Sequence, residues 1–426
     1  MIKIILFLTL ILIFNINDIE SLYVKGPFLI DKDKIILLRG ISRPSLEWYA
    51  FGENLSLNDY KLMKGWGANV VRLSLNQDFW LEKAKLYNKE YKETVAKQVK
   101  MIRSLGMYCI LDLHWSDDGD INTEQAGQKR MADENSIEFW KQVAPIYKND
   151  TGVLFELYNE PLLLPWRVWK EGGVYNGKKY IGMQQLYDAV RNQSAENIVI
   201  INGIRWGFDL YGAKDLVFPG YNIMFGTHPY KDPTRVKKYW DQTFGDLSDK
   251  YPIIATEFGE FTCDTNYTKE FLDYADMKEI HWSAWGWYKK DCAFPSVIAE
   301  WDGTPSAVGE LVKESLTRTI KEININFLDI EDKDKDNEKE KEKEEEEEGK
   351  EAKEKEKENE KDTDHHRHHN TSKENVTPLK SAEDEERDFI DDFETIDEEK
   401  DDDMSVGSSE IGAIVSAAID VENNKT

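Results

Sequence analysis

Two glutamates follow apolar, strand-like runs of this sequence, in positions where a carboxylate could act on a substrate. Glu160 lies in the tripeptide Asn159-Glu160-Pro161, after the run 153–158, and Glu257 ends the run 253–257. A carboxylate at the end of a buried strand is costly unless it is paired or used. Taken alone, either glutamate is equally well explained as an exposed, inert acid at a strand end.

Further polar or aromatic side chains lie in or at the ends of other apolar runs; they are Arg72, His114, Asn159, His228, Tyr230 and Trp285. Each of them singly has a structural explanation, such as a core ion pair or a satisfied buried histidine. In a parallel barrel, however, the carboxyl ends of the strands converge on one rim. Two carboxylates facing each other there suit glycoside hydrolysis, because one can protonate the leaving oxygen while the other attacks the anomeric carbon.

The residues expected near the two glutamates predict which one is the nucleophile and which one is the acid/base. We expect Glu257 to be the nucleophile, because Arg72 and Tyr230 can stabilise its anion. Glu160 is then the acid/base. The two roles require different pKa values, because the acid must be protonated while the nucleophile is ionised. Asn159, beside Glu160, is expected to hydrogen-bond the sugar 2-hydroxyl.

The remaining residues of the set are predicted to bind substrate. His114 and His228 are expected to position it and to tune the two glutamates, and Trp285 offers a flat apolar face for a sugar ring. Six tryptophans near predicted loops could extend that surface, although core packing is the alternative for each; they are Trp48, Trp80, Trp115, Trp166, Trp169 and Trp206.

The elements that must position these residues alternate along the chain. Apolar, strand-like runs occupy 37–42, 68–75, 107–114, 153–158, 198–202, 223–228, 253–257 and 281–285. Helical patterns occupy 57–66, with Ser56 as N-cap and Gly67 as stop, then 91–105, 136–147, 183–194, 234–244, 268–280 and 306–321. Strands at 22–30 and 35–38 precede them. This alternation predicts an α/β fold, a (β/α)8 TIM barrel. The lack of a Gly-rich phosphate loop after any strand weakens nucleotide-binding alternatives.

In its order and residue types, the set Arg72, His114, Asn159-Glu160-Pro161, His228-x-Tyr230, Glu257 and Trp285 resembles glycoside hydrolase family 5, the cellulase-type family. The local sequences of residues 38–42, 111–115 and 255–259 are similar to those of the endoglucanase branch of this family. The resemblance covers about residues 22–320. It implies a (β/α)8 barrel, retention of anomeric configuration, polysaccharide substrates, and no metal or other cofactor. It also implies that Glu160 is the acid/base and Glu257 the nucleophile.

The sequence therefore predicts a secreted retaining endo-β-1,4-glucanase, or cellulase, that hydrolyses internal bonds of cellulose or related β-glucans. A mannanase or a β-1,3-glucanase would use the same catalytic set, and the loops 116–133 and 162–182 are expected to decide between them. A polysaccharide-binding protein without catalysis is the alternative from a different functional class.

Charge divides the chain into a globular part and a tail. Of the net charge of −27, residues 331–426 contribute −21, with 37 acidic and 16 basic side chains. We expect a signal peptide at 1–21, a catalytic domain at 22–325 and a disordered acidic tail at 326–426. Residues 331–360 are nearly all Glu, Lys and Asp and cannot bury enough apolar area to fold alone. The tail is expected to be a solvating spacer, with cation binding as the alternative. The lack of a basic patch argues against nucleic acid binding.

The N-terminus predicts export. Lys3 followed by the apolar run 4–14 fits a secretory signal, and the run is too short to span a membrane. An uncleaved anchor is the alternative. Possible glycosylation sequons are Asn54, Asn149, Asn192, Asn266, Asn370 and Asn375. We expect a secreted monomer whose partner is its polysaccharide substrate, with no membrane contact after leader cleavage.

The three cysteines do not have zinc-site spacing. Cys109, inside an apolar run, is expected to be a buried free thiol. Cys263 and Cys292 each follow a predicted strand end and could form a disulfide in an oxidising compartment. The histidine-rich tract 365–369 could bind a metal weakly, although a solvated tract is the simpler interpretation.

Overall fold

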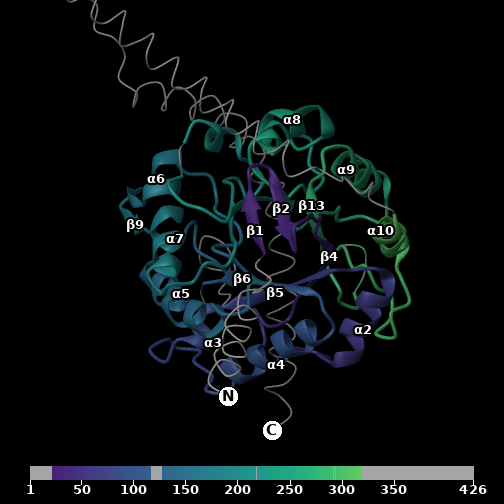
Figure 1. The fold of residues 1–426 in the computed structure, drawn as a ribbon, viewed down its shortest axis with the longest axis horizontal. Coiled ribbons are helices and arrows are strands. Elements are labelled where there is room, and N and C mark those ends of the chain that lie inside the picture. Colours follow the sequence, from purple (N-terminus) through teal and green to yellow (C-terminus); the bar gives the residue numbers. More distant parts are fainter. Residues whose placement is uncertain (1–21, 117–126, 217, 291, 293, 319–426) are drawn as a thin grey trace, which may run out of the picture. The chain divides into compact units, whose positions relative to one another are not determined.

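Eight parallel strands close into a barrel in the computed structural model of the chain, which describes residues 22–116, 127–216, 218–290, 292 and 294–318 (Figure 1). Around the barrel they are β4 (Arg39–Arg43), β5 (Val70–Asn76), β6 (Tyr108–Trp115), β7 (Val153–Glu156), β10 (Val199–Asn202), β11 (Ile223–Thr227), β12 (Ile253–Ala255) and β13 (His281–Ala284). Each strand pairs in parallel with the next, and β13 pairs with β4. The predicted (β/α)8 barrel is confirmed.

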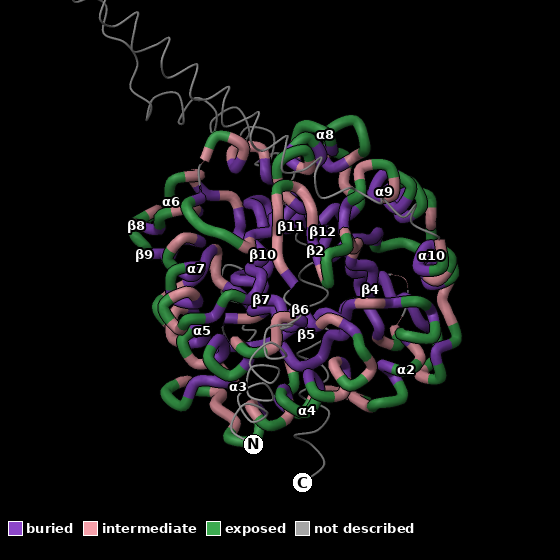
Figure 2. Tube along the Cα trace, in the orientation of Figure 1, coloured by how far each residue is buried: buried purple, intermediate pink, exposed green. Residues whose placement is uncertain are grey.

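Helices surround the barrel, and burial falls from the strands outward (Figures 1 and 2). The α-helices are α2 (Leu57–Trp66), α3 (Gln77–Trp80), α4 (Tyr91–Ser104), α5 (Glu134–Tyr147), α6 (Trp166–Glu171), α7 (Met183–Arg191), α8 (Trp240–Thr243), α9 (Asn266–Met277) and α10 (Ala307–Thr317). The described residues also form three short 3-10 helices, η1 (Tyr211–Lys214), η2 (Lys237–Tyr239) and η3 (Gly245–Asp249). Within the described ranges, no helix is both long and apolar enough to cross a membrane.

Capping residues fix the helix ends that the sequence predicted best. Ser56 accepts a hydrogen bond from the backbone of Asp59, and Gly67 ends α2 with φ 108°, which a residue with a Cβ rarely adopts. The predicted start of α5 at Ser136 is wrong by two residues. Asp133 is the cap, and Ser136 closes a capping box with it from the third helical position.

The predicted helix near 234–244 is shorter than expected: helical turns cover only η2 and α8, from Lys237 to Thr243. Asp232 accepts hydrogen bonds from both the backbone N–H (2.7 Å) and the hydroxyl (2.6 Å) of Thr234. Such a local side-chain turn competes with helix formation. The elements α3, α6 and the hairpin of β8 (Gly173–Tyr175) and β9 (Lys178–Tyr180) were not predicted from the sequence. They lie in the connections between larger elements.

A small antiparallel sheet covers one end of the barrel (Figure 1). The predicted strand 22–30 is in fact two strands, β1 (Tyr23–Lys25) and β2 (Phe28–Asp31), because the chain turns at Gly26, and β3 (Lys34–Ile35) completes the sheet. Leucines from this segment form an apolar cluster with the first inward-facing layer of the barrel; the cluster is Leu22, Leu29, Leu38, Val70, Ile110, Leu154, Ile198, Ile200, Met224 and Ile254. The opposite end is therefore the one left for a site.

Several expectations lie outside the described residues. They are the signal peptide 1–21, the tail 326–426 with its sequons Asn370 and Asn375, the tract 365–369, and most of the loop 116–133.

Candidate active site

All eight side chains singled out from the sequence meet at the carboxyl end of the barrel. They reach it from β5, β6 and the segments that follow β7, β11, β12 and β13. One network of hydrogen bonds, ion pairs and a ring stack joins six of them, namely Arg72, His114, Asn159, Tyr230, Glu257 and Trp285. His228 and Glu160 form a hydrogen-bonded pair beside it.

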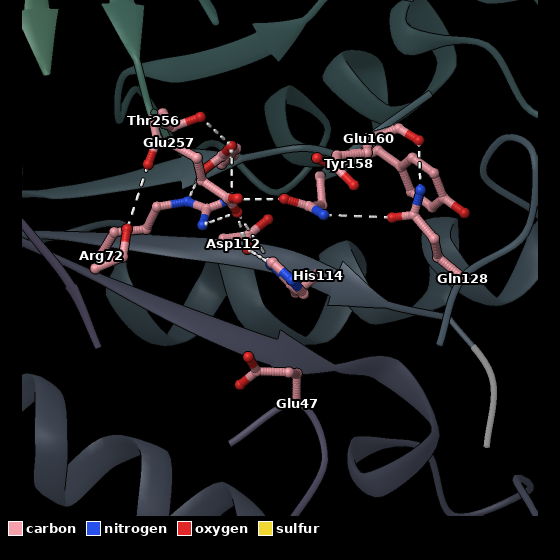
Figure 3. Close-up of polar contacts among 12 residues, drawn as sticks. Glu47, Arg72, Asp112, His114, Gln128, Tyr158, Glu160, Thr256 and Glu257 are labelled. Carbon is pink, nitrogen blue, oxygen red and sulfur yellow. Dashed lines mark hydrogen bonds and ion pairs between the residues drawn. The ribbon is translucent and has the colours of Figure 1, made fainter. Parts of the chain in front are cut away.

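Arg72 is the centre of this network (Figure 3). Its guanidinium is fully buried and contacts three carboxylates: Glu156 (2.6 Å), Glu257 (2.6 Å) and Asp112 (2.9 Å). A fourth contact, 2.7 Å long, is donated to the side-chain oxygen of Asn159. Because a planar guanidinium has several donors in a fixed fork, this one side chain sets the positions of four others.

Glu257 lies just beyond β12 and is almost completely buried. One carboxylate oxygen accepts from Arg72 at 2.6 Å and the other from the hydroxyl of Tyr230 at 2.7 Å. Burial opposes its ionisation, but the positive charges of His228 and Arg72 outweigh burial, so the pKa of Glu257 is lowered. An ionised carboxylate held by donors on both oxygens suits a nucleophile of fixed orientation.

Glu160 has a more open environment, with a side chain 17 % exposed. Its Oε1 lies 2.9 Å from Nδ1 of His228, whose Nε2 lies 2.8 Å from the hydroxyl of Thr256. That hydroxyl donates in turn to Glu156 at 2.7 Å, so it accepts from His228, and Nε2 carries a proton. Although burial opposes it, the charge of Glu257, the nearby carboxylate of Glu156 (3.8 Å) and the hydrogen bond to Glu160 raise the pKa of His228 to about 9. The partner of Glu160 is therefore an imidazole whose protonated form is favoured.

Asn159 is held between two amides and Arg72. Its Nδ2 lies 3.4 Å from Oε1 of Gln128, and its backbone oxygen accepts from Asn202 at 2.6 Å. Asn202 fits because Gly226, on the neighbouring strand, has no Cβ; a Cβ there would lie 1.6 Å from the Asn202 side-chain oxygen. With its own oxygen taken by Arg72, Asn159 can offer only N–H groups to a ligand.

His114 and Trp285 form the side of the site facing Glu257. The two rings stack with centroids 5.3 Å apart and planes 11° apart. Nδ1 of His114 is 2.7 Å from Asp112, which fixes the ring orientation. Burial lowers the pKa of His114, which favours the neutral imidazole.

Glu156, Asp112 and Thr256 were not assigned roles from the sequence, yet they hold the site together. The signal was present for Glu156: a charged residue inside the apolar run 153–158 had to find a partner. Asp112 lies two residues before His114 on the same strand, and therefore on the same face of the sheet. Both carboxylates are fully buried.

Among the described residues, Glu160, His228 and Glu257 have side-chain atoms all within 4.8 Å of one another, a grouping whose residue types could bind a metal. Both ring nitrogens of His228 are already hydrogen-bonded, and its raised pKa favours the protonated form, which cannot bind a metal. The arrangement therefore fits proton transfer better than metal binding.

For two of the six tryptophans, core packing, the alternative, is what the structure shows. Trp80 and Trp169 are fully buried in the core, because aromatic residues near loops pack inward as readily as outward. Trp48, Trp115, Trp166 and Trp206 are partly exposed. Only Trp48 packs against the aromatic cluster that contains Trp285.

The structure shows the state of the three cysteines and the exposure of four of the sequon asparagines. Cys263 and Cys292 form a disulfide between the segments after β12 and β13, with sulfurs 1.99 Å apart. Cys109 is a buried free thiol whose pKa is raised by burial. The sequon asparagines in the described ranges are all exposed; they are Asn54, Asn149, Asn192 and Asn266.

Comparison with known proteins adds sequence evidence to this geometry. Similar curated proteins include Endoglucanase 5 of Pectobacterium carotovorum subsp. carotovorum, 27% identical over 61% of this chain and 48% of that protein. Endoglucanase C of Evansella cellulosilytica is 29% identical over 66% of this chain and 38% of its own length. The chain thus spans about half or less of these relatives.

A solved β-glucanase from Saccharophagus degradans has the same fold, with a TM-score of 0.57 and 24% identity over 70% of this chain and 92% of that one. The family model described as "Cellulase (glycosyl hydrolase family 5)" matches residues 31–291, which span both glutamates and every other residue of the site. The chain belongs to glycosyl hydrolase family 5.

Proposed function

We propose that this protein is a retaining endo-β-1,4-glucanase that hydrolyses internal bonds of cellulose or related β-glucans. The observation that carries the proposal is the separation of the two glutamates: an oxygen of Glu160 lies within 4.8 Å of an oxygen of Glu257. Retaining glycosidases have carboxyl groups about 5 Å apart, whereas inverting ones need about 6.5 to 9.5 Å to admit a water. The printed names of similar proteins, Endoglucanase 5 and Endoglucanase C, support the substrate class.

The environments of the glutamates support the order of events. Glu257 attacks the anomeric carbon, and its negative charge passes to the glycosidic oxygen as that bond breaks. Glu160 gives its proton to this departing oxygen, so the leaving sugar departs with a hydroxyl group. His228, hydrogen-bonded to Glu160, holds this carboxyl group in position for the transfer.

In the second step Glu160 accepts a proton from water, whose oxygen attacks the anomeric carbon and displaces Glu257. Arg72 and Tyr230 receive Glu257 again as a carboxylate, so both lower the barrier by favouring its anion. Asn159, with its oxygen bound to Arg72, directs N–H toward the sugar 2-hydroxyl. Trp285, stacked on His114, supplies the apolar face for the sugar that is attacked.

Two measurements test this proposal. Product release should be compared on carboxymethyl cellulose, mannan and laminarin, with a rapid loss of viscosity on the first showing internal cleavage. Proton NMR of the first product from a cello-oligosaccharide should show the β-anomer. Faster turnover of mannan or laminarin would replace the substrate assignment, an initial α-anomer would refute retention, and binding without turnover would indicate a polysaccharide-binding protein.

We also propose that the enzyme is secreted as a glycoprotein, with the leader 1–21 removed. Exposure of all four described sequon asparagines and the Cys263–Cys292 disulfide support an oxidising compartment. Mass spectrometry of protein from a eukaryotic secretory host, before and after removal of N-glycans, tests this. An unmodified protein that keeps residue 1 would contradict it.

A further inference from the structure

The loop after β10 contains three consecutive residues in the left-handed backbone region. Their φ angles are 57° for Arg205, 56° for Trp206 and 73° for Gly207. Glycine adopts such angles freely, but a bulky residue with a positive φ is strained. Strained residues persist only where the surrounding structure holds them, and they cluster at functional sites. Neighbouring residues must therefore hold this segment, the 205–207 turn, in place.

The 205–207 turn contacts both the chain next to Glu160 and the imidazole that Glu160 contacts. The backbone N–H of Trp206 donates to the backbone oxygen of Pro161 at 2.9 Å, and the backbone oxygen of Gly207 accepts from the N–H of His228 at 3.2 Å. A Cβ on Gly207 would lie 3.0 Å from Cγ and 3.1 Å from Nδ1 of His228. That Nδ1 is the atom 2.9 Å from Glu160, so a shift of the turn would move the partner of Glu160 as well as its backbone.

A buried arginine from the segment after β11 holds this turn. Nη2 of Arg235 donates to the backbone oxygen of Arg205 at 3.2 Å. The guanidinium of Arg235 also lies over two rings, 5.7 Å from the ring centroid of Trp206 and 5.2 Å from that of Phe208. A guanidinium within about 6 Å of an aromatic centroid is attracted to the ring face. One side chain therefore contacts the first two residues of the turn and the residue that follows it.

Arg235 is itself fixed by the helices that cover the barrel. Its backbone oxygen accepts from the indole N–H of Trp240 in α8 at 2.8 Å and from the hydroxyl of Tyr267 in α9 at 3.0 Å. Both of these rings are buried. Burial lowers the pKa of Arg235, and the negative charge of Glu160 is among the influences that oppose this change. Arg235 is thus close enough to Glu160 to interact with its charge.

We propose that Arg235 is a positioning residue for the acid/base: it holds the strained 205–207 turn, and the turn fixes Glu160 and His228 in the arrangement that proton transfer requires. This inference rests on the proposed function, in which Glu160 protonates the departing oxygen. A small displacement of a proton donor slows the step that it assists. It does not slow the departure of a leaving group that needs no proton.

The test compares two substrates whose leaving groups differ in their need for a proton. Phenyl β-cellotrioside requires the acid, because phenolate is a poor leaving group, whereas 2,4-dinitrophenyl β-cellotrioside releases a stable anion without it. Both present an aryl ring to the same part of the site, so weaker binding of the leaving group alone would affect them alike. For Arg235→Met we expect kcat/KM on the phenyl glycoside to fall about tenfold, with the dinitrophenyl glycoside unaffected.

Two further variants separate the arginine from the turn. Arg235→Lys keeps the charge and a hydrogen-bond donor, so it should show the same selectivity with a smaller loss, and it supplies the comparison if Arg235→Met does not fold. Gly207→Ala leaves Arg235 intact but adds a Cβ close to the ring of His228, at a φ that alanine rarely adopts. It should also slow the phenyl glycoside selectively.

A matched control is Arg191→Met at the end of α7. The guanidinium of Arg191 also lies over two rings, those of Tyr187 (4.5 Å) and Tyr221 (4.7 Å), and donates to the backbone oxygen of Ala195 at 2.9 Å. These residues precede β10 and β11 and so lie at the opposite end of the barrel. The control should lower stability without changing the ratio of the two rates.

Two results would overturn the inference. Equal losses of Arg235→Met on both substrates would mean that the arginine only supports the fold or the binding of the leaving group, and no loss on either would mean that the turn holds Glu160 without it. Glu160→Gln is the reference, with the same selectivity and a larger loss. A Glu160→Gln enzyme without that selectivity would instead refute the proposed function.

Discussion

The two ends of the barrel are built by the same strands but from opposite kinds of side chain. Inward-facing residues near the strand starts are apolar, and those two positions further along are polar. The pairs are Val70 and Arg72, Ile110 and Asp112, Leu154 and Glu156, Ile200 and Asn202, and Ile254 and Thr256. Because side chains alternate across a strand, both members of a pair face the barrel axis.

The difference separates stability from chemistry. The apolar layer packs under the leucines of the N-terminal sheet and excludes water. The polar layer buries one guanidinium among three carboxylates, which costs desolvation and is repaid only if every group stays paired. Changes in the polar layer and at the two glutamates proposed to be catalytic should therefore reduce activity, and changes in the apolar layer should reduce stability.

The largest effects should follow loss of one of the two glutamates proposed to be catalytic. Glu160→Gln removes the proposed proton donor and should lower kcat on unactivated glucan by about 10² to 10⁴-fold. Glu257→Gln replaces the proposed nucleophilic carboxylate by a neutral amide and should lower kcat by at least as much. Both changes are nearly isosteric, so thermal unfolding should stay cooperative; a Glu257→Gln enzyme with wild-type turnover would refute the assignment.

The opposite result is expected from Leu154→Ala, two residues before Glu156 on β7. It opens a cavity in the apolar layer and should lower the free energy of unfolding by about 2 to 5 kcal/mol. Denaturant unfolding measures this loss, and kcat/KM well below the new Tm should match the wild type. A fall in kcat/KM as large as that of Glu160→Gln would show that the two layers are not separable.

Arg72→Lys tests the polar layer at constant charge. Lysine cannot reproduce the fork that contacts Glu156, Asp112 and Glu257 at once, so Glu257 loses a donor and its lowered pKa should rise. Because Glu257 must be ionised to attack, activity should fall at acid pH and recover as pH rises. The pH profile of kcat/KM measures the shift, and an unmoved acid limb would contradict it.

The sequence was sufficient to predict the polar rim because strand ends in a parallel barrel must converge, so residue type and order alone placed Glu160, Glu257 and Trp285 together. It could not assign Glu156 to Arg72, because that pairing depends on the register of strands separated by β6. Trp80 and Trp169 are buried by the short helices α3 and α6, which span too few residues for a periodic pattern to show. The predicted helix near 234–244 began too early because the side chain of Asp232 binds Thr234 in a local turn, an interaction that helical periodicity does not report.

Glu47, a fully buried acid after β4 that lies apart from the Arg72 cluster, gives the smallest expected effect (Figure 3). Its Oε2 accepts from the backbone of Ser45 at 2.7 Å, and no described residue hydrogen-bonds its Oε1. Burial raises the pKa of Glu47 to about 7. The folded protein therefore holds this proton more tightly than the unfolded chain does, and it loses stability as pH rises from about 4.5 to about 7.

Glu47→Gln keeps the acceptor for Ser45 and puts an uncharged group where the proton was, so it should remove that penalty. The variant should match the wild type near pH 4 and exceed it at pH 8 by about 3 kcal/mol in the free energy of unfolding, measured by denaturant titration. Parallel stability curves across this range would show that Glu47 is ionised without cost. That result would mean that this barrel tolerates a buried, ionised glutamate that forms no ion pair. The contribution of Arg72 to keeping the buried carboxylates of the polar layer ionised would then be smaller than its short contacts with them indicate.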